Sequence, residues 1–349
     1  MDIYGNFAIV NRDAIPKKIS HIMYDADGTL LDRSQIEQPM IEKMLGISRA
    51  GVHQTVITGR DAPWIFKMFD FLKQGNNRLL LDRFSFIAEY GLIECDLSTN
   101  KTHVVSDVGT NHPILDPEIR KGVAGLVWQP ARLRKYLPGI IDLVDSYIGA
   151  DSESNCYFIP KSKLVSAPHH MWHPAKEVMM TVTMIRDGIG RLMPEAIDNH
   201  LSAAAKITEF LEQKGVAQEI KVIAASSAID LVPIVKTRAG MTMPFDKDLA
   251  AGNAIWSLAE KKGINALELC QETIGIGDSG TDILFSVPII GPMCCDVAMF
   301  FVGAKKNFTP QTDQEKKNIA GVSLHVLDKG LEYGSEVTMA ILDWLDNRF

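Results

Sequence analysis

Asp25 and Asp27 lie two positions apart in the segment HIMYDADGTLLD, directly after an apolar run and directly before a glycine and a threonine. Residues i and i+2 of a strand point to the same side, so both carboxylates would face the crevice at the carboxyl end of a parallel strand, where open α/β sheets bind ligands. There, one carboxylate can act as a nucleophile and its neighbour as a general acid or base. Because like charges this close repel each other, a cation or a reaction must make use of the pair.

The elements that position this pair alternate between strand and helix. Gly28 permits the sharp turn that leaves the first strand, and Asp61 is placed as the N-cap of a helix. Periodicity predicts strands at 17–29, 52–60, 84–96, 272–278 and 297–303, and helices at 34–51, 61–75, 248–263, 281–288 and 332–349. This alternation is typical of a doubly wound, Rossmann-like parallel sheet of the α/β class.

A block in the middle of the chain breaks the alternation. It is rich in turns at first and then carries helices and strongly β-branched strands. We expect an inserted α/β cap domain over residues 98–235, and a core formed by residues 1–97 and 236–349.

The composition bounds the classes of partner. Of 349 residues, 46% are hydrophobic and 23% charged, which is typical of a globular chain. A net charge of −7 argues against a nucleic-acid-binding surface. No apolar stretch reaches the roughly 20 residues that span a bilayer, and the first residues lack the organisation of a signal peptide. Five scattered cysteines without a CxxC pair favour reduced thiols and a cytoplasmic location.

With these elements in place, DADGTLLD resembles the first motif of the haloacid dehalogenase superfamily of phosphatases and phosphotransferases. The other motifs of that family follow in order. VITGR at 56–60 resembles the second motif, Lys247 at the start of a helix resembles the third, and IGIGDSGTDILF at 274–285 resembles the fourth. The resemblance therefore covers nearly the whole chain outside the details of the cap.

The place of the insertion narrows the resemblance. It follows FIAEYGLIECD at 86–96, which is similar to the AENGA or AEHGA signature of the Cof-like and sugar-phosphate phosphatases and of phosphomannomutase. Those enzymes carry an α/β cap at this point. Tyr90 stands where that signature usually has Asn or His.

The resemblance implies a role for each motif residue. Asp25 would attack phosphorus and form an aspartyl phosphate, while Asp27 would protonate the leaving oxygen and then help to deprotonate water. Thr58, through its hydroxyl, and Gly59, through its backbone N–H, would bind one phosphate oxygen. Lys247 would offset the charge on the phosphoryl group.

The metal that the resemblance implies is Mg²⁺. Its ligands would be Asp25, the main-chain carbonyl of Asp27, and Asp278, with Asp282 either holding a metal-bound water or supporting the lysine. Lys236 remains a rival for the third motif, because the family pattern usually has glycine directly after its lysine, whereas Asp248 follows Lys247. Arg60 is interpreted as a solvated or structural arginine.

The cap would recognise the rest of the substrate. Candidate contacts are His169, Arg186 and Arg191, since aromatic and cationic groups suit sugars and anions. The stretch HHMWH also contains His170, Trp172 and His173, but no cysteine or acidic residue lies at ligand spacing from it. A substrate loop and an ordinary loop are therefore both preferred to a metal cluster.

We expect a Mg²⁺-dependent phosphatase that acts on a phosphorylated sugar or a similar small metabolite, with neither nucleic acid nor membrane as a partner. A phosphomutase of the phosphomannomutase type and a non-catalytic binding or regulatory protein are the alternatives. A dehalogenase is disfavoured because it would have no use for Asp27. The sequence leaves the oligomeric state open.

Overall fold

The computed structural model describes residues 2–4, 7–9, 11–31, 35–104, 179–183, 194–215, 217–224, 228–236, 242–290, 293–303, 307–322 and 334–346. The chain divides into two compact units. One comprises Met1–Ile114 together with Asp246–Phe349, and the other comprises Leu115–Phe245. Among the described residues, no helix is both long and apolar enough to cross a membrane.

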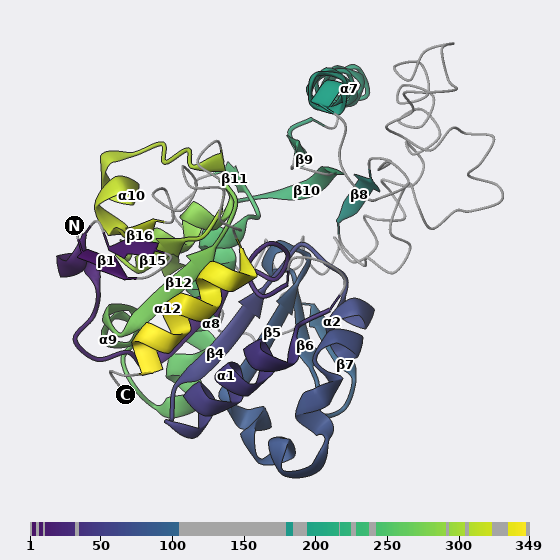
Figure 1. Ribbon diagram of the computed structural model, residues 1–349. Coiled ribbons are helices and arrows are strands. Elements are labelled where there is room, and N and C mark those ends of the chain that lie inside the picture. Colours follow the sequence, from purple (N-terminus) through teal and green to yellow (C-terminus); the bar gives the residue numbers. More distant parts are fainter. Residues whose placement is uncertain are drawn as a thin grey trace. The chain divides into compact units, whose positions relative to one another are not determined.

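The first unit is built around a sheet with the strand order β1-β2-β16-β15-β12-β3-β4-β5-β6-β7 (Figure 1). The strands from β16 to β5 in this order are parallel to one another, and antiparallel pairs extend both edges. The strands are β1 (Asp2–Tyr4), β2 (Phe7–Ile9), β3 (His21–Tyr24), β4 (His53–Ile57), β5 (Phe84–Ala88), β6 (Ile93–Asp96), β7 (Lys101–Val104), β12 (Thr273–Gly277), β15 (Ala298–Phe301) and β16 (Ile319–Val322). The expected α/β class with a largely parallel sheet is confirmed.

Helices connect these strands. The α-helices are α1 (Gln38–Arg49), α2 (Ala62–Met68), α8 (Lys247–Lys262), α9 (Ala266–Gln271), α10 (Asp313–Asn318) and α12 (Ser335–Asp346). Short 3₁₀ helices are η1 (Arg12–Ala14), η2 (Asp70–Lys73), η3 (Gly75–Arg83), η4 (Glu89–Gly91) and η7 (Asp282–Ser286), and a small hairpin pairs β13 (Ile289–Ile290) with β14 (Met293–Cys294). As expected, Asp61 caps α2, because its carboxylate accepts from the N–H of Trp64 at 2.8 Å.

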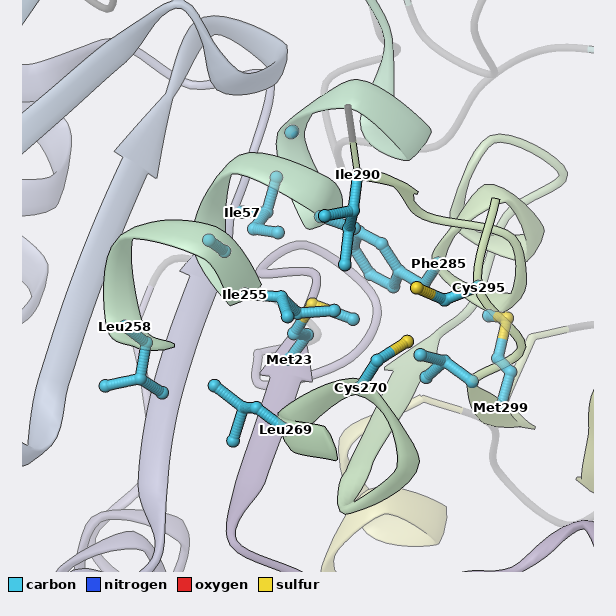
Figure 2. Close-up of a cluster of buried hydrophobic side chains, with 14 of the residues drawn as sticks. Met23, Ile57, Ile255, Leu258, Leu269, Cys270, Phe285, Ile290, Cys295 and Met299 are labelled. Atoms are coloured by element: carbon cyan, nitrogen blue, oxygen red, sulfur yellow. The ribbon is translucent and has the colours of Figure 1, made fainter. Parts of the chain in front are cut away.

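Successive side chains of β3 and β4 point to opposite faces of the sheet, and the two faces differ in character. On one face the Tyr24 hydroxyl donates to the Gln54 side chain at 3.1 Å, and the Gln54 amide donates to Met44 and Ser48 of α1. α1 in turn contacts α12 (Figure 1). The apolar core of the other face collects side chains from β3, β4, α8, α9 and β15, including Met23, Ile57, Ile255, Leu269 and Met299 (Figure 2). Burial of these side chains anchors α8 to the sheet.

Two segments differ from the sequence prediction. Residues 84–96 form two antiparallel strands, β5 and β6, joined by η4. The chain reverses there because Glu89, Tyr90 and Gly91 all take positive φ values, which an extended strand does not allow. The helix expected at 281–288 is the single 3₁₀ turn η7.

The second unit contains an antiparallel sheet and a long helix. Its described elements are β8 (Met180–Thr183), α7 (Pro194–Gln213), β9 (Ile220–Ala224), β10 (Ala228–Lys236) and β11 (Thr242–Pro244). β10 pairs with β8, β9 and β11, and α7 contacts β9 and β10. The sequence placed the insertion at 98–235, whereas β7 at Lys101–Val104 still pairs with the sheet of the first unit.

Candidate active site

The polar residues of the motifs meet where three neighbouring parallel strands end. Asp25 follows β3, Thr58 follows β4 and Asp278 follows β12, and β3 pairs with both other strands. The Asp25 N–H donates to the Ile276 carbonyl at 3.0 Å, which continues the pairing of β3 with β12 beyond the strand. Neighbouring parallel strands place their carboxyl ends at one edge, so the topology itself gathers these side chains.

Gly28 gives the Asp278 carboxylate its space. Its φ is 73°, in the region that glycine populates without strain. A Cβ at this position would lie 2.4 Å from the Asp278 Oδ2 atom. The glycine is therefore required both by its turn and by the close approach of a carboxylate.

Lys247 is the first residue of α8 and points into this group. Its ammonium donates to the Asp25 Oδ1 atom at 2.7 Å and also to Asp282. All three side chains are buried. Burial acts to lower the pKa of Lys247, but the carboxylates of Asp25 and Asp282 outweigh it and raise that pKa above its usual value. The rival Lys236 ends β10, and its side chain lies outside the described residues.

Asp282 supports both the lysine and the loop that carries Asp278. Its Oδ2 atom accepts from the N–H groups of Asp278 at 3.1 Å and Ser279 at 2.8 Å, and from the Ser279 hydroxyl at 2.7 Å. Its Oδ1 atom faces Lys247. Of the two roles expected for Asp282, support of the lysine is the one that these contacts favour.

The carboxylates form a strongly anionic group. Oxygen atoms of Asp25, Asp278 and Asp282 lie within 4.8 Å of one another. Burial, and then the charges of Asp282 and Asp25, raise the pKa of Asp278 to about 9. Burial and the Asp282 charge likewise raise the pKa of Asp25 to about 7. Such a set of hard oxygen donors fits a divalent cation such as Mg²⁺, whose charge would offset their repulsion.

Asp27 has a partner that sequence reasoning missed. The Arg60 guanidinium donates to both of its carboxylate oxygens at 2.7 Å, and it also lies over the Trp64 ring at 5.4 Å. This bidentate contact fixes the orientation of the Asp27 carboxylate next to the turn that follows β4. The available signal was that Arg60 ends the segment after β4, the neighbour of β3.

Thr58 and Gly59 lie next to Tyr90. Thr58 is buried, and its hydroxyl oxygen accepts from the backbone N–H of Arg60 at 3.2 Å. The hydroxyl proton is not used in this bond and can be donated to another group. A Cβ on Gly59 would lie 3.2 Å from the Tyr90 ring. The glycine thus leaves room for an aromatic ring beside the expected phosphate site.

The expected substrate contacts of the cap lie outside the described residues. These are His169, Arg186 and Arg191, together with the rest of the HHMWH stretch. Their roles stay predictions.

Comparison with known proteins supports the fold. No protein-family model matches the sequence, and no curated protein is significantly similar to it. Among solved structures, the C-terminal domain of a trehalose-6-phosphate phosphatase from C. albicans is similar over 95% of this chain and 93% of that chain, with 14% identity and a TM-score of 0.53. A haloacid dehalogenase-like hydrolase from Bacteroides thetaiotaomicron covers 94% of this chain and is itself covered completely (100%), with 12% identity and a TM-score of 0.49. The chain therefore shares the fold of the C. albicans phosphatase domain.

Proposed function

We propose that this chain is a Mg²⁺-dependent phosphatase of the haloacid dehalogenase superfamily that hydrolyses a small phosphorylated metabolite. The observation that carries the proposal is the buried Lys247 ammonium bound to Asp25 where β3, β4 and β12 end. A nucleophilic carboxylate, a fixed positive charge and a second acidic residue two positions on are the groups that phosphoryl transfer through an enzyme ester needs.

The steps follow from the positions of these groups. Asp25 attacks phosphorus, so that a bond from its carboxylate oxygen to phosphorus forms as the ester bond to the leaving oxygen breaks. Asp27 gives a proton to that leaving oxygen and then takes one from the water that hydrolyses the aspartyl phosphate. The ion pair with Arg60 orients the ionised Asp27 carboxylate, which is the form that takes the proton from water.

Charge on the phosphoryl oxygens is offset by donors at the start of α8 and in the turn after β4. Lys247 supplies a full positive charge, and Thr58 and Gly59 supply an O–H and an N–H. A Mg²⁺ ion held by Asp25, Asp278 and the main-chain carbonyl of Asp27 would add Lewis-acid stabilisation of the same oxygens. Asp282 orients Lys247 and supports the loop that carries Asp278.

A sugar phosphate is the substrate class that we favour. These core groups handle the phosphoryl group alone, so the second unit would act as the cap that reads the leaving group and excludes water. The similar C. albicans domain belongs to a phosphatase named for trehalose-6-phosphate, which fits a sugar-phosphate substrate. We also propose that the enzyme is cytoplasmic and acts on a small metabolite, because the cysteine usage noted above favours reduced thiols.

A panel of phosphorylated metabolites tests the proposal. The chain should release phosphate from p-nitrophenyl phosphate and from at least one sugar phosphate in the presence of Mg²⁺, and Asp25→Asn should abolish that release. Transfer of the phosphoryl group to another hydroxyl of the sugar, rather than to water, would identify a mutase instead. A phosphopeptide hydrolysed better than every sugar phosphate would overturn the substrate class.

A further inference from the structure

Tyr90 occupies a backbone conformation that does not suit it. Glu89, Tyr90 and Gly91 have φ values of 52°, 58° and 110°. Glycine adopts this left-handed region freely and asparagine tolerates it, whereas the Cβ of a bulky residue makes it costly. A tyrosine in such a position points to a compensating role for its side chain.

Two backbone hydrogen bonds hold this conformation. The Glu89 N–H donates to the Arg60 carbonyl and the Tyr90 N–H donates to the Thr58 carbonyl, both at 3.0 Å. The turn after β5 is thereby tied to the turn after β4, whose residues are the expected phosphate donors. These bonds therefore fix the position of the Tyr90 backbone relative to the expected phosphate donors.

The Tyr90 ring lies next to Gly59 and near the ammonium of Lys247. The Lys247 Nζ atom is 5.8 Å from the centre of the Tyr90 ring and 5.4 Å from the centre of the Phe285 ring. Gly59 makes room for the Tyr90 ring, because any Cβ at that position would lie only 3.2 Å from it. Tyr90 itself is buried, with 6% of its surface exposed. A ring face in this place attracts the cation and keeps water from its ion pair.

We propose that Tyr90 is a positioning residue that holds the Lys247 ammonium against Asp25. The inference rests on the proposed function, in which Lys247 offsets phosphoryl charge. It assigns a purpose to the departure from the Asn or His of the family signature. The aromatic face, rather than the hydroxyl, is the part that acts on the ammonium.

Three substitutions at this position separate the ring from the rest of the side chain. Tyr90→Phe keeps the ring and should retain kcat within about twofold. Tyr90→Leu and Tyr90→Asn remove it and should lower kcat about tenfold, the size expected of a cation–π contact at a desolvated site, with little change in KM. Equal kcat values for the Phe, Leu and Asn variants would overturn the proposal.

Phe84→Leu is the matched control for loss of a buried aromatic ring. Phe84 begins β5 and is 7% exposed, and its ring stacks on that of Phe86. This variant should lower the melting temperature while leaving kcat unchanged. A fall in kcat equal to that of Tyr90→Leu would show that general loosening of the core explains both.

A second readout does not depend on activity. The ammonium protons of Lys247 should give a slowly exchanging signal in ¹H–¹⁵N spectra, because the group is buried and ion-paired. Tyr90→Phe should keep this signal, while Tyr90→Leu should shift it and speed its exchange with water. An unchanged signal in Tyr90→Leu would refute the positioning role. A wild-type chain that hydrolyses no phosphate ester would refute the proposed function. The spectra would still test the positioning role of Tyr90 in that case.

Discussion

The Lys247 Nζ atom lies 2.7 Å from the Asp25 Oδ1 atom, although the two residues are 222 positions apart in the sequence. The contact joins the first residue of α8 to the end of β3 and is enclosed by Asp282 and two aromatic rings. Both partners are buried, so removal of one leaves an uncompensated charge in a medium that solvates it poorly.

Lys247→Ala should therefore impair both activity and folding. We expect kcat to fall by a factor of about 10² to 10³, the range for loss of one charge-stabilising group, and the free energy of unfolding to fall by about 3–5 kcal/mol. Lys236→Ala is the control and should behave like the wild type in both assays. A larger loss of kcat in Lys236→Ala would reassign the third motif.

Asp25→Asn and Asp27→Asn should fail in different ways. The first removes the nucleophile, so no phosphoenzyme should be trapped with any substrate. The second removes the proton donor, so alkyl phosphates should suffer more than p-nitrophenyl phosphate, whose leaving group needs no proton. Equal losses of kcat across leaving groups would argue against Asp27 as the acid.

Activity should require a divalent cation whose affinity depends on the space at Gly28. EDTA should abolish hydrolysis and Mg²⁺ should restore it, and Gly28→Ala should raise the Mg²⁺ concentration for half-maximal activity because its Cβ would lie 2.4 Å from Asp278. Gly51→Ala is a matched control, since Gly51 has a φ of 94° with open space around it. It shares the backbone strain without the clash and should leave the Mg²⁺ dependence unaltered. Full activity with chelator present would exclude a metal.

The amino ends of the central strands should make the fold sensitive to acid. His53 is buried against Ser85, and burial followed by the charges of Lys262, Lys261 and Arg83 lowers its pKa to about 3. His53 takes up a proton near pH 6.5 in the unfolded chain, so this group binds more protons there than in the folded chain between about pH 6.5 and 3. Its contribution to stability therefore falls as the pH drops through this window.

Urea unfolding at two pH values measures this effect. Between pH 7.5 and 5, His53 should account for a loss of about 2 kcal/mol in the free energy of unfolding. His53→Gln should reduce that loss, whereas His103→Gln, at an exposed position of β7, should not. An identical loss in wild type and His53→Gln would place the acid sensitivity elsewhere.

Substitution of the proposed cap contacts should affect sugar phosphates selectively. His169→Ala, Arg186→Ala and Arg191→Ala should lower kcat/KM for the best sugar phosphate. The same variants should hydrolyse p-nitrophenyl phosphate at nearly the wild-type rate, because that small substrate makes little use of a cap. Parallel losses on both substrates would indicate a structural role for these residues.

Several features of the fold and site were readable from local sequence. The apolar runs that end in Asp25, Thr58 and Asp278 predicted strands, and the periodicity of the segments between them predicted helices. The parallel strand order of α/β chains places the ends of such strands at one edge of the sheet. The N-cap of α2 at Asp61 was readable for the same reason, since a cap depends on residues close in the chain.

Other features depend on which side chains the completed fold brings together. The Arg60 fork on Asp27 spans two strands, and the reversal at Tyr90 carries its ring to Lys247 on a distant helix. No local pattern encodes these contacts, because they depend on strand order and side-chain direction across long separations in the chain. The sequence by itself therefore determined the α/β class and the residues at the strand ends. Only the tertiary structure decided their partners. The attraction between two charged side chains becomes strong when packing brings them together and excludes water from both.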